Sequence, residues 1–222
     1  RCHERMAKAA PDVSGEYYKE ALAPGEPGSK QGTALMVLAG MTDAARASDN
    51  VLKSEGARGF STFYGYYMLE AMAKAGDYEE AMEMIRTFWG GMLDLGATTF
   101  WEDFNIDWLK DAPAPIDRLV PDGKKDIHGD FGAYCYEGFR HSLCHGWASG
   151  PTAWLSRHVL GVEVVEPGCR VISIEPHLGN LEWAEGTFPT PYGDVRISHK
   201  KGSDGKIITK TDAPKGIRII LK

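Results

Sequence analysis

Apolar residues recur at the spacing of an amphipathic helix over the first two thirds of the chain. A helix-compatible piece over residues 4–10 is followed by a connection rich in Pro and Gly. Beyond it, Leu35, Leu38 and Met41 stand three residues apart. One face of a helix has this period, so we expect an amphipathic helix over residues 30–53.

Two further helices are predicted on either side of Gly76. Residues 61–75 carry a broad stripe of aromatic and methionine side chains at spacings of three and four, and a similar stripe follows Asp77 as far as Met92. Glycine commonly ends a helix, and Asp77 with Glu80 three positions on has the pattern of a capping box. The short turn favours an αα-hairpin whose stripes form a core rather than a cofactor site.

Polar chemistry gathers directly after Gly96, where the third helix is predicted to end. The stretch that follows sets three carboxylates, Glu102, Asp103 and Asp107, among four aromatic side chains, Phe100, Trp101, Phe104 and Trp108. Sugar-cleaving sites use such a pattern, because ring faces stack on a sugar and carboxyl groups transfer protons. The same residues also fit a helix-end loop whose aromatic side chains pack and whose acids are solvated.

Between Lys110 and Gly132 the chain becomes polar and rich in Pro and Gly, which predicts a long excursion over the surface. Its end, residues 126–132, either reaches back to the site or forms a Gly-punctuated turn. A last long helix is predicted over residues 139–160, with a kink near Pro151.

From Gly161 onward the period of the pattern changes from about 3.6 to 2. Short β-branched segments, separated by turns, lie at residues 171–174, 181–186, 195–199, 206–211 and 217–221. We expect a small antiparallel β-sandwich here. The predicted fold class is therefore mainly α with a β tail, with a helical domain at residues 1–165 and a β domain at 166–222.

Composition and charge exclude several classes of partner. A content of 43% hydrophobic and 25% charged residues is that of a soluble globular protein, and a net charge of −6 without a basic cluster argues against nucleic acid. No apolar run is long enough for a transmembrane helix, so no membrane partner is expected. The chain starts at Arg1 without a methionine, which suggests a piece of a longer protein. Its compartment (periplasm, extracellular space or cytoplasm) stays open.

The cysteines give no clear metal site. Cys2, Cys135, Cys144 and Cys169 are widely spaced and form no Cys-x-x-Cys pair. A site built from His141, Cys144 and His145 can be imagined, but adjacent Cys and His residues on a helix point in different directions. We therefore expect buried free thiols, and neither a metal nor a cofactor.

Several stretches together form a recognisable set: Gly96-Ala-Thr-Thr-Phe-Trp-Glu102, His141-Ser-Leu-Cys-His-Gly-Trp-Ala-Ser-Gly-Pro-Thr-Ala-Trp-Leu155, Pro167-Gly168, Ile174-Glu-Pro176 and Phe188-Pro-Thr-Pro-Tyr-Gly193. From about Ser61 onward the chain resembles the C-terminal half of a family 78 glycoside hydrolase, an α-L-rhamnosidase. The resemblance implies an (α/α)6 toroid followed by a β-sandwich. Residues 1–165 would then hold the C-terminal half of the toroid.

The resemblance also implies an activity, the inverting release of terminal α-L-rhamnose from glycosides or polysaccharides. Glu102 matches the general base, which deprotonates the attacking water. His145 matches the sugar-contacting histidine of the family's Ser-Leu-x-His motif, and Trp101 and Trp147 would be platforms for the sugar. The general acid is expected on upstream sequence. The isolated chain should therefore be inactive without the missing N-terminal half of the toroid.

Two features depart from the family pattern. Cys144 stands where the family usually has Asn, and the stretch between residues 107 and 136 is longer than the common connection. These departures leave open a related glycosidase that acts on another hexose or on a uronic acid. The residues also fit an inactive carbohydrate-binding homologue, or a helical scaffold in which Glu102 is buried in a salt bridge.

Overall fold

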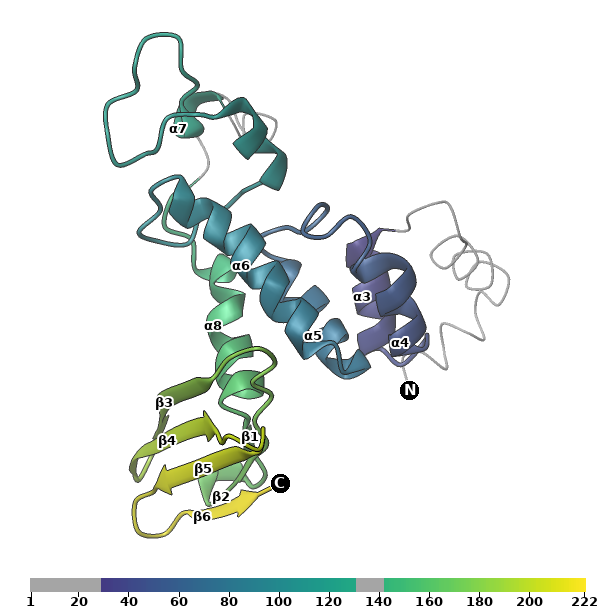
Figure 1. The fold of residues 1–222 in the computed structure, drawn as a ribbon, viewed down its shortest axis with the longest axis vertical. Coiled ribbons are helices and arrows are strands. Elements are labelled where there is room, and N and C mark those ends of the chain that lie inside the picture. The colour runs from purple at the N-terminus through teal and green to yellow at the C-terminus, as the bar shows by residue number, and fades with distance from the viewer. Residues whose placement is uncertain (1–28, 131–141) are drawn as a thin grey trace. The chain divides into compact units, whose positions relative to one another are not determined.

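A computed structural model describes residues 29–130 and 142–222 of the chain (Figure 1). The chain divides into two compact units, residues 1–150 and 151–222. The helix expected over residues 4–10 and the start of the one expected at 139 lie outside the described residues. The half toroid and the domain boundary between residues 165 and 166 stay predictions.

The first unit is helical. Its elements are α3 (Lys30–Leu38), α4 (Ala44–Ala47), the π-helical turn η1 (Ser48–Leu52), α5 (Gly65–Ala75), α6 (Tyr78–Asp94), the 3-10 turn η2 (Ile106–Asp111), α7 (Ile127–Asp130) and the 3-10 turn η3 (Gly146–Ser149). The single helix predicted over residues 30–53 is therefore broken. Gly40 adopts a φ of 70°, and Asp43 caps the next helix by accepting a hydrogen bond from the backbone N–H of Arg46.

Helices α5 and α6 follow one another as predicted, with Gly76 at a φ of 88° between them. Their apolar stripes are buried, among them Met68 and Met72 on α5 and Phe88 on α6, which confirms a core role for these side chains. The predicted capping box is wrong, because Asp77 makes no side-chain cap hydrogen bond. Its carboxylate instead lies 3.2 Å from Nζ of Lys53.

The second unit begins with a short helix and continues as strands. The elements are α8 (Gly150–Trp154), the π-helical turn η4 (Leu155–Val159), β1 (Val162–Val164), the 3-10 turn η5 (Pro167–Cys169), β2 (Val171–Ile174), β3 (Trp183–Thr190), β4 (Gly193–Lys201), β5 (Ile207–Asp212) and β6 (Arg218–Leu221). Pro151 does not kink a long helix. It stands in the first turn of α8, where a missing N–H costs no helical hydrogen bond.

The strands form two sheets, in the orders β1-β2-β6 and β3-β4-β5. The expectation of an antiparallel domain is wrong for one pair, because β2 and β6 run parallel. The chain leaves the second sheet after β5, and β6 then lies beside β2 in the first sheet.

Both sheets contribute to one hydrophobic core, as in a sandwich. Val162, Ile172 and Ile174 come from the first sheet, and Val195 and Ile197 from the second. No helix in the described part of the chain is long and apolar enough to cross a membrane.

Candidate active site

Two segments distant in the sequence meet at Glu102. Helix α6 ends at Asp94, and Gly96 turns the chain at a φ of 85° into the loop that carries Glu102. The backbone N–H of Glu102 donates to the carbonyl of Ser142 at 2.8 Å, and the N–H of His145 donates to the carbonyl of Phe100 at 2.7 Å. These backbone bonds bring Glu102 and His145 together.

The Glu102 carboxylate is anchored and shielded but still reachable. Its Oε2 accepts a hydrogen bond of 2.8 Å from the backbone N–H of Ser142 and lies 3.9 Å from Nδ1 of His145. The Glu102 side chain is 12% exposed, against 29% for His145. A carboxylate in this position has a fixed orientation and partial contact with solvent, which a proton acceptor needs.

The backbone carbonyl of Glu102 has two further contacts. The hydroxyl of Thr62, a residue that is 3% exposed, donates to the carbonyl of Glu102. The indole Nε1 of Trp147 lies 3.5 Å from the same carbonyl oxygen. The sequence alone did not point to Thr62, and Ser142 entered only as the first residue of the Ser-Leu-x-His motif. Each lies 40 residues from Glu102, and no local spacing links them to it.

Beside the carboxylate lies an exposed aromatic surface. The rings of His145 and Trp147 have centroids 4.2 Å apart, and Trp147 is 50% exposed. Phe63 packs edge-on against Trp147 at 5.5 Å and is itself 40% exposed. Half of the Trp147 surface is therefore accessible, and its role as a sugar platform stays a prediction.

Trp101 differs from Trp147. It is fully buried and packs against Phe104, with ring centroids 6.2 Å apart. A sugar cannot stack on a ring face that protein already covers. The burial argues against the predicted sugar contact of Trp101 and favours a role in packing the loop.

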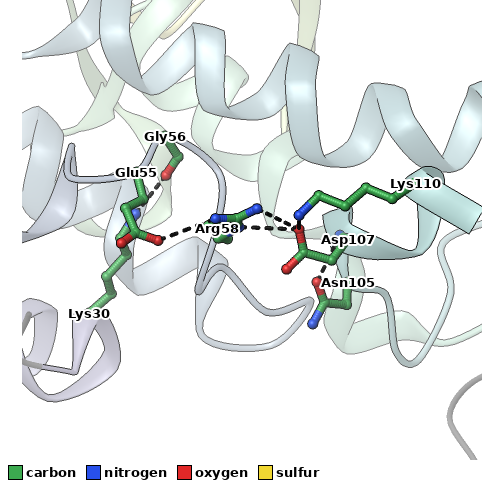
Figure 2. A network of polar contacts seen from close by, with 7 residues as sticks. All are labelled: Lys30, Glu55, Gly56, Arg58, Asn105, Asp107 and Lys110. Carbon is green, nitrogen blue, oxygen red and sulfur yellow. Dashed lines mark hydrogen bonds and ion pairs between the residues drawn. The ribbon is translucent and has the colours of Figure 1, made fainter.

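Asp107, another carboxylate of the same stretch, forms ion pairs with Arg58 and Lys110 (Figure 2). Its Oδ1 accepts hydrogen bonds from Nε and Nη2 of Arg58 at 3.1 and 3.0 Å and lies 2.8 Å from Nζ of Lys110. The hydrogen bond from Lys110, together with that from Arg58, holds the pKa of Asp107 below its usual range. This carboxylate stays ionised and joins the turn at Arg58 to η2, which is a structural role.

Within residues 29–130 and 142–222 no group of three His, Cys, Asp or Glu side chains is placed to hold a metal ion. Of the metal ligands considered from sequence, His141 lies outside this part of the chain. Cys144 is an exposed free thiol and Cys169 a half-buried one, so the expectation of buried thiols is wrong for Cys144.

The family model described as the bacterial alpha-L-rhamnosidase C-terminal domain matches residues 161–222. An alpha-L-rhamnosidase of Alteromonas sp. (strain LOR) is 29% identical over 135 residues, which cover 60% of this chain and 12% of that protein. The chain thus spans only a small part of the curated relative it matches.

Solved structures agree with this similarity. The crystal structure of a GH78 family rhamnosidase of Bacillus sp. GL1 superposes with a TM-score of 0.64 at 28% identity, over 87% of this chain and 19% of that one. The native alpha-L-rhamnosidase of Aspergillus terreus superposes with a TM-score of 0.66 over 87% of this chain and 21% of its own, at 20% identity. The latter likeness concerns the fold alone.

Proposed function

From the similarity of this chain to the C-terminal part of family 78 α-L-rhamnosidases, we propose that it supplies the general base of an inverting exo-glycosidase. The complete protein would release terminal α-L-rhamnose from glycosides or polysaccharides. The general base is Glu102. The general acid lies on sequence outside these 222 residues. This assignment is compatible with the chain spanning only 12% to 21% of its relatives' lengths.

One observation carries the proposal. The Glu102 carboxylate is fixed by the N–H of Ser142, keeps limited solvent contact, and lies 3.9 Å from His145. A purely helical scaffold would instead have Glu102 buried in a salt bridge. The 12% exposure of its side chain and its position beside an exposed tryptophan favour a site.

In the proposed mechanism Glu102 removes a proton from water. The oxygen of that water forms a bond to the anomeric carbon on the face opposite the leaving group, and the glycosidic C–O bond breaks. The bonding electrons pass to the leaving oxygen, which takes a proton from the general acid. The two carboxyl groups must stand about 6.5–9.5 Å apart to leave room for the water.

His145 and Trp147 hold the sugar in this proposal. The imidazole can donate or accept a hydrogen bond with a sugar hydroxyl. The half-exposed indole of Trp147 offers an apolar face to the methyl group of a deoxy sugar. Because their rings are 4.2 Å apart, one sugar can touch both.

In this proposal the helices of residues 1–165 form half of a toroid. Such a half would leave apolar surface uncovered until the remaining helices of the complete protein pack on it. The isolated 222-residue chain is therefore expected to be inactive. The assay is release of rhamnose from an aryl α-L-rhamnoside by the chain alone, and appreciable turnover would mean that the acid is within these residues.

The base assignment is tested with Glu102→Gln in the complete protein. General-base catalysis contributes about 10²- to 10⁴-fold, so kcat on an aryl α-L-rhamnoside should fall by that factor. Glu79→Gln on the exposed face of α6 is the matched control and should keep wild-type kcat. Wild-type turnover by Glu102→Gln would exclude Glu102 as the base.

A further inference from the structure

Strands β3, β4 and β5 lie side by side in one sheet (Figure 1). The side chains on the outer face of this sheet form regular rows. Strand β4 alternates buried and more exposed residues, with Val195, Ile197 and His199 facing the core. The residues between them align with both neighbours in register. The outward rows are Trp183–Lys200–Ile208, Glu185–Ser198–Lys210 and Thr187–Arg196–Asp212.

Two hollows lie on this face. One has a volume of about 470 Å³ and the other of about 390 Å³. Glu185, Ser198 and Lys210 line both of them, so the hollows adjoin one another across the middle row. Each volume falls within the range of about 300–1,000 Å³ that small-molecule sites occupy, and two adjoining hollows suit a chain of linked units.

An apolar platform lies at one edge of this face. Trp183 is 60% exposed, and Ile208, two strands away in the same row, is 55% exposed. Grouped apolar side chains on a surface mark a binding site, whereas single ones are normal, and the larger member of this pair is the indole of Trp183. Its flat face can stack on a sugar ring, while the neighbouring Ser198 and Glu185 can hydrogen-bond to hydroxyl groups.

The charge of the face favours an anionic ligand. The outward rows contain three cationic side chains, Arg196, Lys200 and Lys210, and two anionic ones, Glu185 and Asp212. The charges of Arg196 and Asp212 partly cancel, because these side chains lie 3.7 Å apart. Residues 151–222 as a whole contain ten Lys and Arg and eight Asp and Glu, whereas the complete chain contains 25 and 31. The β unit is thus weakly cationic within an acidic protein, so it attracts negative charge to this face.

We propose that the outer face of β3-β4-β5 binds an acidic polysaccharide, a chain of sugars that carry uronic-acid carboxylates. Trp183 stacks on a sugar ring, and Lys200 and Lys210 pair with the carboxylates. That the ligand is a carbohydrate and not another polyanion rests on the proposed function, whereas the anionic character of the ligand rests on the charges of this face. Binding at this face does not depend on Glu102.

The probe is polygalacturonate, titrated by calorimetry into the complete protein carrying Glu102→Gln as well as into the wild type. Both should bind it equally, with an affinity that falls as salt is added, because ion pairs at a surface are screened. Trp183→Ala should weaken binding about tenfold. The double substitution Lys200→Gln and Lys210→Gln should weaken it several-fold and reduce its salt dependence.

The matched control is Lys215→Gln, which removes an exposed lysine from the loop between β5 and β6 and should leave the affinity unchanged. Circular dichroism of each variant checks that the sheet is intact. Absence of binding, or an affinity unchanged by Trp183→Ala, would overturn the proposal. Equal affinity for neutral dextran would overturn the role of charge, and tighter binding of single-stranded DNA would assign the face to nucleic acid. If Glu102→Gln loses turnover but binds polygalacturonate as the wild type does, the role of Glu102 as the base is supported independently of binding at this face.

Discussion

The loop that carries Glu102 and the β core of residues 151–222 are stabilised by different interactions. Glu102 is held by hydrogen bonds from Ser142 and Thr62, with exposed aromatic rings beside it. The β core instead consists of fully buried aliphatic side chains from two sheets, such as Ile172 and Ile174. Stability and activity should therefore respond to different substitutions in the two regions.

The largest effect on stability is expected in the β core. Ile172→Ala removes a fully buried side chain from the central strand of the first sheet. It should lower the free energy of unfolding by about 2–5 kcal/mol, through lost apolar burial and a cavity. Thermal unfolding of the complete protein measures this, with Val165→Ala, at a residue 52% exposed, as control. At a temperature where the fold persists, kcat should be unchanged, and a large drop in kcat would mean that the two regions are coupled.

In the loop that carries Glu102, a substitution should lower kcat more than it lowers stability. Thr62→Val keeps the shape of a buried side chain but removes the hydroxyl that donates to the Glu102 carbonyl. The Glu102 carbonyl would lose the donor from Thr62 and keep the 3.5 Å contact with Nε1 of Trp147. Loss of a buried hydrogen-bond partner costs about 1–3 kcal/mol, and we expect much of that cost to appear as a loss of kcat of about five- to a hundredfold. Thr62→Ser retains a donor and should recover most of the rate. If Thr62→Val hydrolysed the substrate as fast as wild type, this hydrogen bond would have no part in positioning the base.

A smaller effect is expected from acid on the β core. His199 is 1% exposed, with Nε2 3.1 Å from the carbonyl of Leu160 and Nδ1 2.9 Å from the hydroxyl of Thr209. Burial lowers its pKa below the ordinary value of 6.5. Between the two pKa values the unfolded chain binds more protons, so stability present above about pH 6.5 is lost as pH falls towards the folded-state pKa.

Melting temperatures measured from pH 7.5 to 5 test this, because they should decline below about pH 6.5. His199→Gln keeps an amide that can bond to the same two partners and should make the decline shallower. The burial of His177 lowers its pKa as well, so a part of the decline should persist in that variant. An identical pH profile for wild type and His199→Gln would show that His199 does not titrate as described.

The smallest effect is expected from the ion pair between Arg58 and Asp107, whose side chains are 46% and 40% exposed. Exposed ion pairs are screened by solvent and contribute little to stability, so Arg58→Gln should change both melting temperature and kcat only slightly. Arg86→Gln, which removes a similarly exposed pair with Glu83, is the matched control. A tenfold loss of kcat in Arg58→Gln alone would mean that this pair sets the position of the Glu102 loop.

Local patterns predicted much of the fold. The strand expected at residues 171–174 is β2, and the αα pattern around Gly76 is α5 followed by α6. Period and turn residues are local properties, so they can be read from sequence. The parallel pairing of β2 with β6 could not be read in this way, because pairing between distant strands leaves no local mark. Strand β1 has only three residues, too few to show a period of two.

The candidate site was only partly predictable. Glu102, His145 and Trp147 follow from the resemblance, and the structure brings them together. The burial of Trp101 did not follow, because an aromatic residue beside a carboxylate looks the same in sequence whether its ring faces solvent or core. The role of Thr62 could not be predicted for another reason. It depends on a contact with the main chain of Glu102, which does not restrict the sequence around either residue.

The central claim is that Glu102 activates a water molecule instead of attacking the sugar itself. The most direct test is proton NMR of the sugar first released by the complete protein from an aryl α-L-rhamnoside, recorded before mutarotation. Attack by water opposite the leaving group gives β-L-rhamnose first, with the α anomer appearing later, and this is the predicted result. Release of α-L-rhamnose as the first product would indicate a covalent intermediate and contradict the account.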